Sequence, residues 1–135
     1  MDEIVSTRRY GRVVVAYCRG ELDLATKPQL EAGLLGLPGR PGAEAVVVDL
    51  SEVGFLDCTA LSTLLTVARR CMRVGRPYLL SGPSPLVRRV LTALELDRVL
   101  TIVGTADEAV ALARTMLAQP VPSGPGSPQD SLWTT

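Results

Sequence analysis

The sequence contains no histidine and only one lysine, Lys27. Histidine is the usual general base near neutral pH, a member of the Ser-His-Asp and Cys-His catalytic sets, and a common zinc ligand. Its absence excludes these kinds of site. The phosphate-binding motifs GxGxxG and GxxxxGK[ST] and the nucleophile motif GxSxG are absent as well. We therefore expect a protein that is not an enzyme and that holds no cofactor and no metal ion.

Cysteine is scarce and odd in number, with Cys18, Cys58 and Cys71 far apart in the chain. There is no CxxC pair, so the pattern matches neither a disulfide framework nor a zinc site. We expect Cys18 and Cys71 to behave as small buried hydrophobic residues.

Long apolar runs are missing too, since no stretch approaches the roughly 18 residues of a membrane span. Residues 1–10 show no apolar segment of the kind that precedes a secretory cleavage site. The 14 basic and 14 acidic residues cancel, which argues against general nucleic-acid binding. We expect a cytoplasmic protein without a membrane or nucleic-acid partner.

Arginines cluster in two places, and we interpret both groups as solvated helix faces. The alternative is a patch that binds an anion or a protein. The groups are Arg69, Arg70, Arg73 and Arg76, and Arg88 with Arg89.

Hydrophobic residues make up 47% of the chain, which is enough for a core. Their spacing predicts strands over residues 4–10, 13–18, 45–50, 77–80 and 99–103. Helices are predicted to begin at Thr26, to cover residues 59–74, and to begin again after Ser84 and Thr105. The order ββαβαβαβα indicates a single α/β domain, with a mostly parallel sheet of about five strands covered by helices. We expect this domain to span residues 1–118.

Residues 119–135 are rich in Pro, Gly and Ser, a composition that predicts a disordered tail. Trp133 in this tail could be a docking residue, but the simpler interpretation is that it belongs to an unstructured end.

Local signals refine the helix starts. Thr26 with Gln29, and Thr105 with Glu108, both match a capping box. Pro85 after Ser84 is typical of a first helical position. The residues expected to face the core from the first, third and fourth helices are Leu30, Leu34 and Leu37; Leu86, Val90, Leu91 and Leu94; and Ala109, Leu112, Ala113 and Met116.

The segment 46–65, VVVDLSEVGFLDCTALSTLL, is the one around which the chain is organised. Its valine run predicts a strand buried on both faces. Ser51, Glu52 and Gly54 predict a loop, after which Phe55 and Leu56 return to the core.

The helix that follows begins with Asp57, Cys58 and Thr59, where free backbone N–H groups and the positive end of the helix dipole meet. From residue types alone, Asp57 or Thr59 simply caps the helix. The alternative is that Thr59 is a phosphorylation site, at which a phosphate would add about −1.5 to −2 charges.

Three segments resemble the STAS domain, specifically the bacterial anti-sigma factor antagonists: residues 20–26 (GELDLAT), 46–51 (VVVDLS) and 55–61 (FLDCTAL), the last similar to the signature D-S-[ST]-G-L. The resemblance covers roughly residues 1–118. It implies a small domain that binds an anti-sigma factor and so releases a sigma factor. The anti-sigma factor is often a serine kinase of the GHKL type, which phosphorylates the antagonist and abolishes binding, and a PPM-type phosphatase can restore it.

The resemblance also assigns the site. Thr59 takes the acceptor position, while Cys58 occupies the other hydroxyl position and Ala60 replaces the family's glycine. Asp23 resembles a carboxylate close to the acceptor, although from its residue type it is equally a turn-former, and Asp49 is expected to make hydrogen bonds at the end of its strand. The partner-binding residues implied are Glu21, Leu22, Asp23, Leu24, Asp57, Cys58, Thr59, Ala60, Leu61 and Leu64.

Two other functions remain open from the sequence. A STAS protein that is no longer phosphorylated would act as a constitutive binder or as a subunit of a signalling complex. A different class is a thiol device, in which Cys58 is a redox sensor or nucleophile with a pKa lowered by the helix N-terminus.

Overall fold

The computed structural model describes residues 3–119, and its centre is a five-stranded sheet in the order β1-β2-β3-β4-β5. The strands are β1 (Val5–Tyr10), β2 (Val13–Leu22), β3 (Ala45–Leu56), β4 (Tyr78–Ser81) and β5 (Thr101–Val103). β1 and β2 form an antiparallel hairpin, and β2 to β5 are parallel. The predicted α/β fold, with its element order and mostly parallel sheet, is confirmed.

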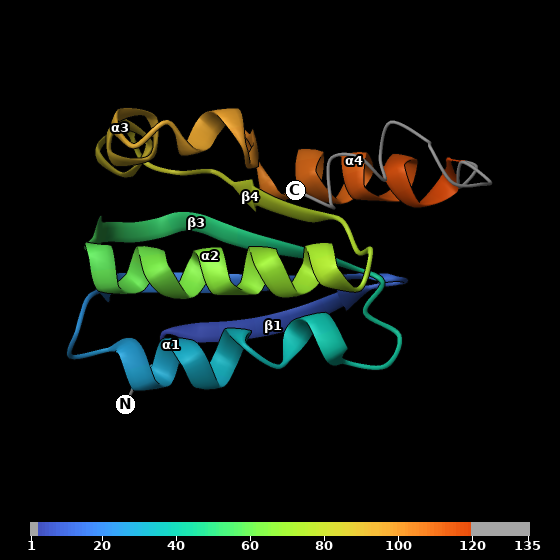
Figure 1. Ribbon diagram of the computed structural model, residues 1–135, viewed down its shortest axis with the longest axis horizontal. Helices are drawn as coiled ribbons and strands as arrows, with labels where there is room; N and C mark the ends of the chain where they lie inside the picture. The colour runs from blue at the N-terminus through green and yellow to red at the C-terminus, as the bar shows by residue number, and fades with distance from the viewer. Residues whose placement is uncertain (1–2, 120–135) are drawn as a thin grey trace.

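Helices cover both faces of this sheet (Figure 1). They are α1 (Lys27–Leu34), α2 (Cys58–Arg73), α3 (Pro85–Ala93) and α4 (Ala106–Ala118), with short 3-10 turns at Leu37–Gly39 and Leu96–Arg98. Side chains alternate along a strand, so β3 sends Val46 and Val48 into the core shared with α1, α2 and α3. Its Val47 joins a second, smaller core beneath α4. Within the described residues, no helix is long and apolar enough to cross a membrane.

Two strands run further than predicted. β2 ends at Leu22 instead of Cys18, and β3 ends at Leu56 instead of Leu50. Two register shifts in the pairing of β2 with β3 explain why both strands were predicted too short. In the first, Tyr17 pairs with Asp49 but Arg19 pairs with Glu52. In the second, Gly20 pairs with Val53 but Glu21 pairs with Phe55. Each shift inserts one extra residue into β3, as a β-bulge does, and breaks the alternation by which a strand is recognised. The residues that face the helices from this part of β3 are therefore three apart: Leu50, Val53 and Leu56.

The bulges also decide where Phe55 points. Leu56 is buried, as expected, but 45% of the Phe55 surface is exposed. The prediction that Phe55 returns to the core is therefore wrong, because the second bulge turns it away from the helices α1 to α3. Ser51, Glu52 and Gly54, predicted as a loop, lie within β3.

Most helix signals are confirmed. The Ser84 hydroxyl accepts from the Val87 N–H, and the Thr105 hydroxyl accepts from the Glu108 N–H. Thr26 is the N-cap residue of α1 but makes no side-chain capping bond, so the capping box predicted with Gln29 is wrong.

The inward face of α1 is confirmed, because Leu30 and Leu34 are fully buried; Leu37, predicted on the same face, is also buried but lies in the 3-10 turn that follows α1. In α3 the buried pair is Val87 and Leu91, whereas Leu86 and Leu94 are each 51% exposed. The prediction is therefore confirmed for Leu91 and for Val90, which packs partly against the core, and wrong for Leu86 and Leu94. In α4, Ala109 and Ala113 are buried, and Leu112 and Met116 pack partly against them. α4 ends at Ala118, and the predicted tail with Trp133 lies outside the described residues.

Candidate functional site

The start of α2 is fixed by Asp57. Its backbone is extended (φ −101°, ψ −179°), and its carboxylate accepts a hydrogen bond of 3.0 Å from the Ala60 N–H. The Asp57 N–H donates to the Leu22 carbonyl at 3.1 Å, which ties the end of β3 to the end of β2. Of the two capping residues that the sequence allowed, Asp57 is the one that caps, and Thr59 lies in the first helical turn.

The two residues after Asp57 differ in accessibility. Cys58 is exposed and Thr59 is half-buried. Ala60, next in the chain, is fully buried, so its methyl group packs within the core beneath α2. Thr59 therefore lies at the boundary between the surface and the core.

Asp23 lies in the turn between β2 and α1. Its backbone N–H donates to the Thr26 hydroxyl at 3.0 Å, and its carboxylate accepts from the Thr26 N–H at 3.0 Å. The Thr26 hydroxyl also donates to the Glu21 carbonyl at 2.9 Å. Asp23 is thus a turn-former, and the same bonds explain why Thr26 does not close a capping box. They hold Leu24, which is 70% exposed, at the outer edge of this turn.

Burial divides the predicted partner-binding residues into two groups. Glu21, Leu24 and Cys58 are exposed, while Asp23, Asp57 and Thr59 are half-buried. The other four are at most 6% exposed, so they support this surface from below: Leu22, Ala60, Leu61 and Leu64. Six of the ten residues are thus accessible at one end of the sheet, and we call these six the α2-start surface.

Arginines mark the opposite end of α2. Arg70 donates to the Leu35 carbonyl at 2.9 Å, and Arg76 donates to the Ala43 carbonyl at 2.6 Å. These two hydrogen bonds connect the segment between α1 and β3 to the last turn of α2 and to the chain that follows it. Arg69, Arg73, Arg88 and Arg89 are exposed, as expected for solvated helix faces.

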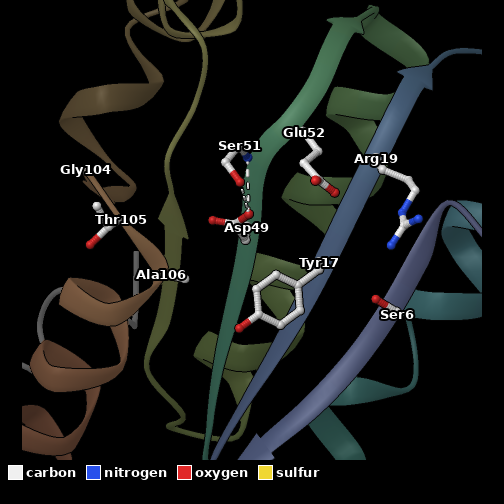
Figure 2. A pocket seen from close by; sticks show the side chains of 9 residues that line it. All are labelled: Ser6, Tyr17, Arg19, Asp49, Ser51, Glu52, Gly104, Thr105 and Ala106. Atoms are coloured by element: carbon white, nitrogen blue, oxygen red, sulfur yellow. Dashed lines mark hydrogen bonds between the residues drawn. The ribbon is translucent and has the colours of Figure 1, made fainter.

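A polar groove of about 470 Å³ lies on the other face of the sheet, the face that carries α4 (Figure 2). Its floor includes Asp49, which is only 4% exposed. The Asp49 carboxylate accepts bonds from the hydroxyls of Ser51 (2.5 Å) and Ser81 (2.8 Å), so it joins β3 to β4. The expected hydrogen bonding of Asp49 is confirmed, although the residue lies within its strand. The wall of the groove is lined by Tyr17, Arg19 and Glu52. In the sequence, the feature that could have indicated this groove is the change from valines to polar residues along the two strands that hold these side chains.

The cysteines lie in contrasting environments. Cys18 and Cys71 are buried, as predicted, and burial raises the pKa of both thiols to about 12. Cys58 is an exposed free thiol at the start of α2. No group of three potential metal-binding side chains lies close together in residues 3–119.

The cap of α2 gives a first prediction. Replacing Asp57 by alanine should lower the free energy of unfolding by about 1 kcal/mol, because the Ala60 N–H loses its acceptor. Urea denaturation measures the change. Asp57→Asn is the matched control and should unfold within a few tenths of a kcal/mol of the wild type, since asparagine caps equally well. Equal losses in both variants would show that the carboxylate acts by some means other than capping.

Comparisons with known proteins agree with this architecture. The family model described as the STAS domain matches residues 5–109. The anti-sigma-F factor antagonist RsfA of Mycobacterium tuberculosis is 27% identical over 105 residues, which cover 77% of this chain and 82% of RsfA. A second M. tuberculosis protein, named as an anti-anti-sigma factor, is 35% identical over 65 residues; that match spans 48% of this chain and 44% of the other protein.

Solved structures extend the likeness to three dimensions. The crystal structure of an anti-sigma factor antagonist from Mycobacterium paratuberculosis superposes with a TM-score of 0.74 and 26% sequence identity, covering 82% of this chain and 92% of that one. The matched family region contains all five strands and the whole of α2, with the Asp57 turn that starts it. The chain therefore belongs to the STAS domain family.

Proposed function

We propose that this protein is an anti-sigma factor antagonist, which binds an anti-sigma factor through the α2-start surface and so releases a sigma factor. The observation that carries the proposal is a hydroxyl side chain, Thr59, in the first turn of an Asp57-capped helix, beside exposed residues of the β2–α1 turn. The names of RsfA and of the second M. tuberculosis relative describe the same role in those proteins. This role belongs to the cytoplasm and requires no catalysis by the chain itself.

Phosphorylation of Thr59 is proposed as the switch that ends binding. The anti-sigma factor would be a serine/threonine kinase of the GHKL type, and a PPM-type phosphatase would reverse its action. A phosphate adds about −1.5 to −2 charges at a half-buried position two residues after Asp57, whose carboxylate caps the same helix. Burying such a charge in an interface without a cationic partner costs several kcal/mol. Each ~1.4 kcal/mol is tenfold in affinity, so a single phosphate suffices to separate the two proteins.

The alternative within the family is a constitutive binder that uses the same surface without phosphorylation. It differs in one testable respect: Thr59→Ala would then behave like the wild type under every condition that changes kinase activity. Thr59 offers the kinase a β-branched side chain in place of the commoner serine, which restricts its χ1 angle. The Thr59→Ser variant therefore tests whether this restriction slows the switch.

Capture from an extract of the producing organism tests the binding role. The immobilised full-length chain should retain an anti-sigma factor, and the purified chain should displace the sigma factor from a complex with that protein. Glu21→Arg on the α2-start surface should reduce capture, while Arg114→Glu, at an exposed position of α4 outside that surface, should not. An extract in which sigma–anti-sigma complexes are present but none is retained or dissociated would refute the proposal.

A further inference from the structure

Phe55 is the only phenylalanine in the chain, and it lies close to the α2-start surface without being part of it. Its 45% exposure is not unusual in itself, because single apolar side chains are common on the surfaces of soluble domains. Its position is what distinguishes it. The second bulge in β3 turns Phe55 onto the face of the sheet opposite α2, where it pairs in the ladder with Glu21 of β2. Two residues later the chain reaches Asp57 and the helix start.

This part of the sheet face lies beyond the packing of α4. The core beneath α4 uses residues nearer the beginnings of the strands, such as Val13, Val15 and Val47. Further along β2 and β3 the same face carries Arg19 and Glu52 at the wall of the polar groove, and the two strands continue past them (Figure 2). By strand register, Glu21 and Phe55 are the next pair on this face. An exposed aromatic ring thus stands between the groove and the α2-start surface.

We propose that Phe55 anchors the anti-sigma factor interface, which continues from the start of α2 over the end of the sheet onto the face opposite α2. This inference rests on the proposed function. The partner would offer an apolar socket for the phenyl ring, because aromatic side chains bury a large area and commonly act as anchors in interfaces. Glu21 and Glu52 are both exposed on the same sheet face as the ring. Arg19 is the ladder partner of Glu52, whereas Glu21 pairs with Phe55 itself, so Glu21 in particular calls for a basic residue beside that socket.

Charge argues against a second copy of this chain as the occupant. In a two-fold dimer the same patch meets itself, so the Glu21 beside the ring of one copy would approach the Glu21 of the other around the paired rings. Like charges brought together in an interface are unfavourable. A different protein with the complementary charge avoids this cost.

The same arrangement is compatible with a phosphate switch. The basic residue of the partner faces Glu21 and Glu52, on the sheet face turned away from α2. Thr59 lies in the first turn of α2, and the proposal places no partner cation on that side of the sheet, so a phosphate there would find no counter-charge. The anchor and the switch thus lie on different elements of one interface, Phe55 on β3 and Thr59 on α2.

The test uses the anti-sigma factor retained by the wild-type chain, purified and titrated by calorimetry against full-length variants. Phe55→Ala should weaken binding by about 30-fold, as expected for an aromatic anchor. Leu94→Ala is the matched control, since Leu94 is 51% exposed at the end of α3, and its affinity should stay within twofold of the wild type. The double variant Glu21→Gln/Glu52→Gln should slow association about tenfold at low salt. Unfolding midpoints measured for each variant show whether the fold is intact.

A photo-crosslinking phenylalanine analogue at position 55 avoids loss of the ring and should crosslink to the anti-sigma factor. Equal affinities of Phe55→Ala and the wild type, together with no crosslink at position 55, would overturn this inference and leave the proposed function standing. Self-association of the wild type that is lost in Phe55→Ala would instead identify a second copy as the occupant. If the wild type retains no anti-sigma factor, the proposed function fails first and the inference with it.

Discussion

Thr59→Glu should bind the anti-sigma factor at least about 30-fold more weakly than the wild type, while remaining folded. A carboxylate at this half-buried position cannot be desolvated without a cation, and an uncompensated buried charge costs about 3–5 kcal/mol. The positive end of the α2 dipole offsets only about 0.3–1 kcal/mol of that cost. The same dipole keeps the free variant stable, since anions are tolerated at helix N-termini. Calorimetric titration with the purified anti-sigma factor measures the affinity, and far-UV circular dichroism verifies the fold.

Two controls separate charge from shape. Thr59→Ser keeps the hydroxyl and should bind within a few-fold of the wild type. Thr115→Glu introduces the same carboxylate at an exposed position of α4 and should leave the affinity unchanged. If Thr59→Glu binds as tightly as the wild type, the phosphorylation switch loses its physical basis and the constitutive-binder interpretation takes its place.

Leu64→Ala should lower the free energy of unfolding by about 3 kcal/mol. Leu64 is fully buried in the core that α2 shares with the sheet, and leucine-to-alanine changes at such positions leave a cavity that costs about 2–5 kcal/mol. The resemblance to the family had included Leu64 among the residues that bind the partner. Its burial instead predicts an indirect role, in which it holds the start of α2 in place.

Met72→Ala is the matched control on the same helix. Met72 is 39% exposed, so its truncation should change the free energy of unfolding by no more than about 0.5 kcal/mol. Urea denaturation of both variants provides the comparison. A Leu64→Ala protein that unfolds like the wild type but no longer binds the anti-sigma factor would show that Leu64 contacts the partner directly.

The fold was predictable because its signals are strong and mutually consistent. Valine-rich strands alternate with helices, and Ser84 and Thr105 cap two of those helices as their residue types predict. Parallel strands joined by helices leave few arrangements open. Thr26 shows the limit of such local rules, because its hydroxyl is taken by Asp23 and the Glu21 carbonyl instead of closing a capping box.

The site was less predictable because it depends on the register of β2 against β3. Two inserted residues in β3 change the spacing of inward-facing side chains from two to three, as in Leu50, Val53 and Leu56. An alternation rule cannot recognise such a strand, so the segment appeared to be a loop. The same shift turns Phe55 outward, and neither composition nor spacing indicated that its ring would be exposed. Asp57 was one of the two caps that the sequence allowed, because N-capping depends on neighbours in the chain.

Intact-mass and phosphopeptide analysis would test the central claim most directly. The purified chain and its Thr59→Ala variant would be incubated with ATP and an extract of the producing organism that is shown to phosphorylate other antagonists. We expect a single added phosphate that maps to Thr59 in the wild type and is absent from Thr59→Ala. An unmodified wild-type chain in that active extract, or a phosphate at another residue, would contradict it.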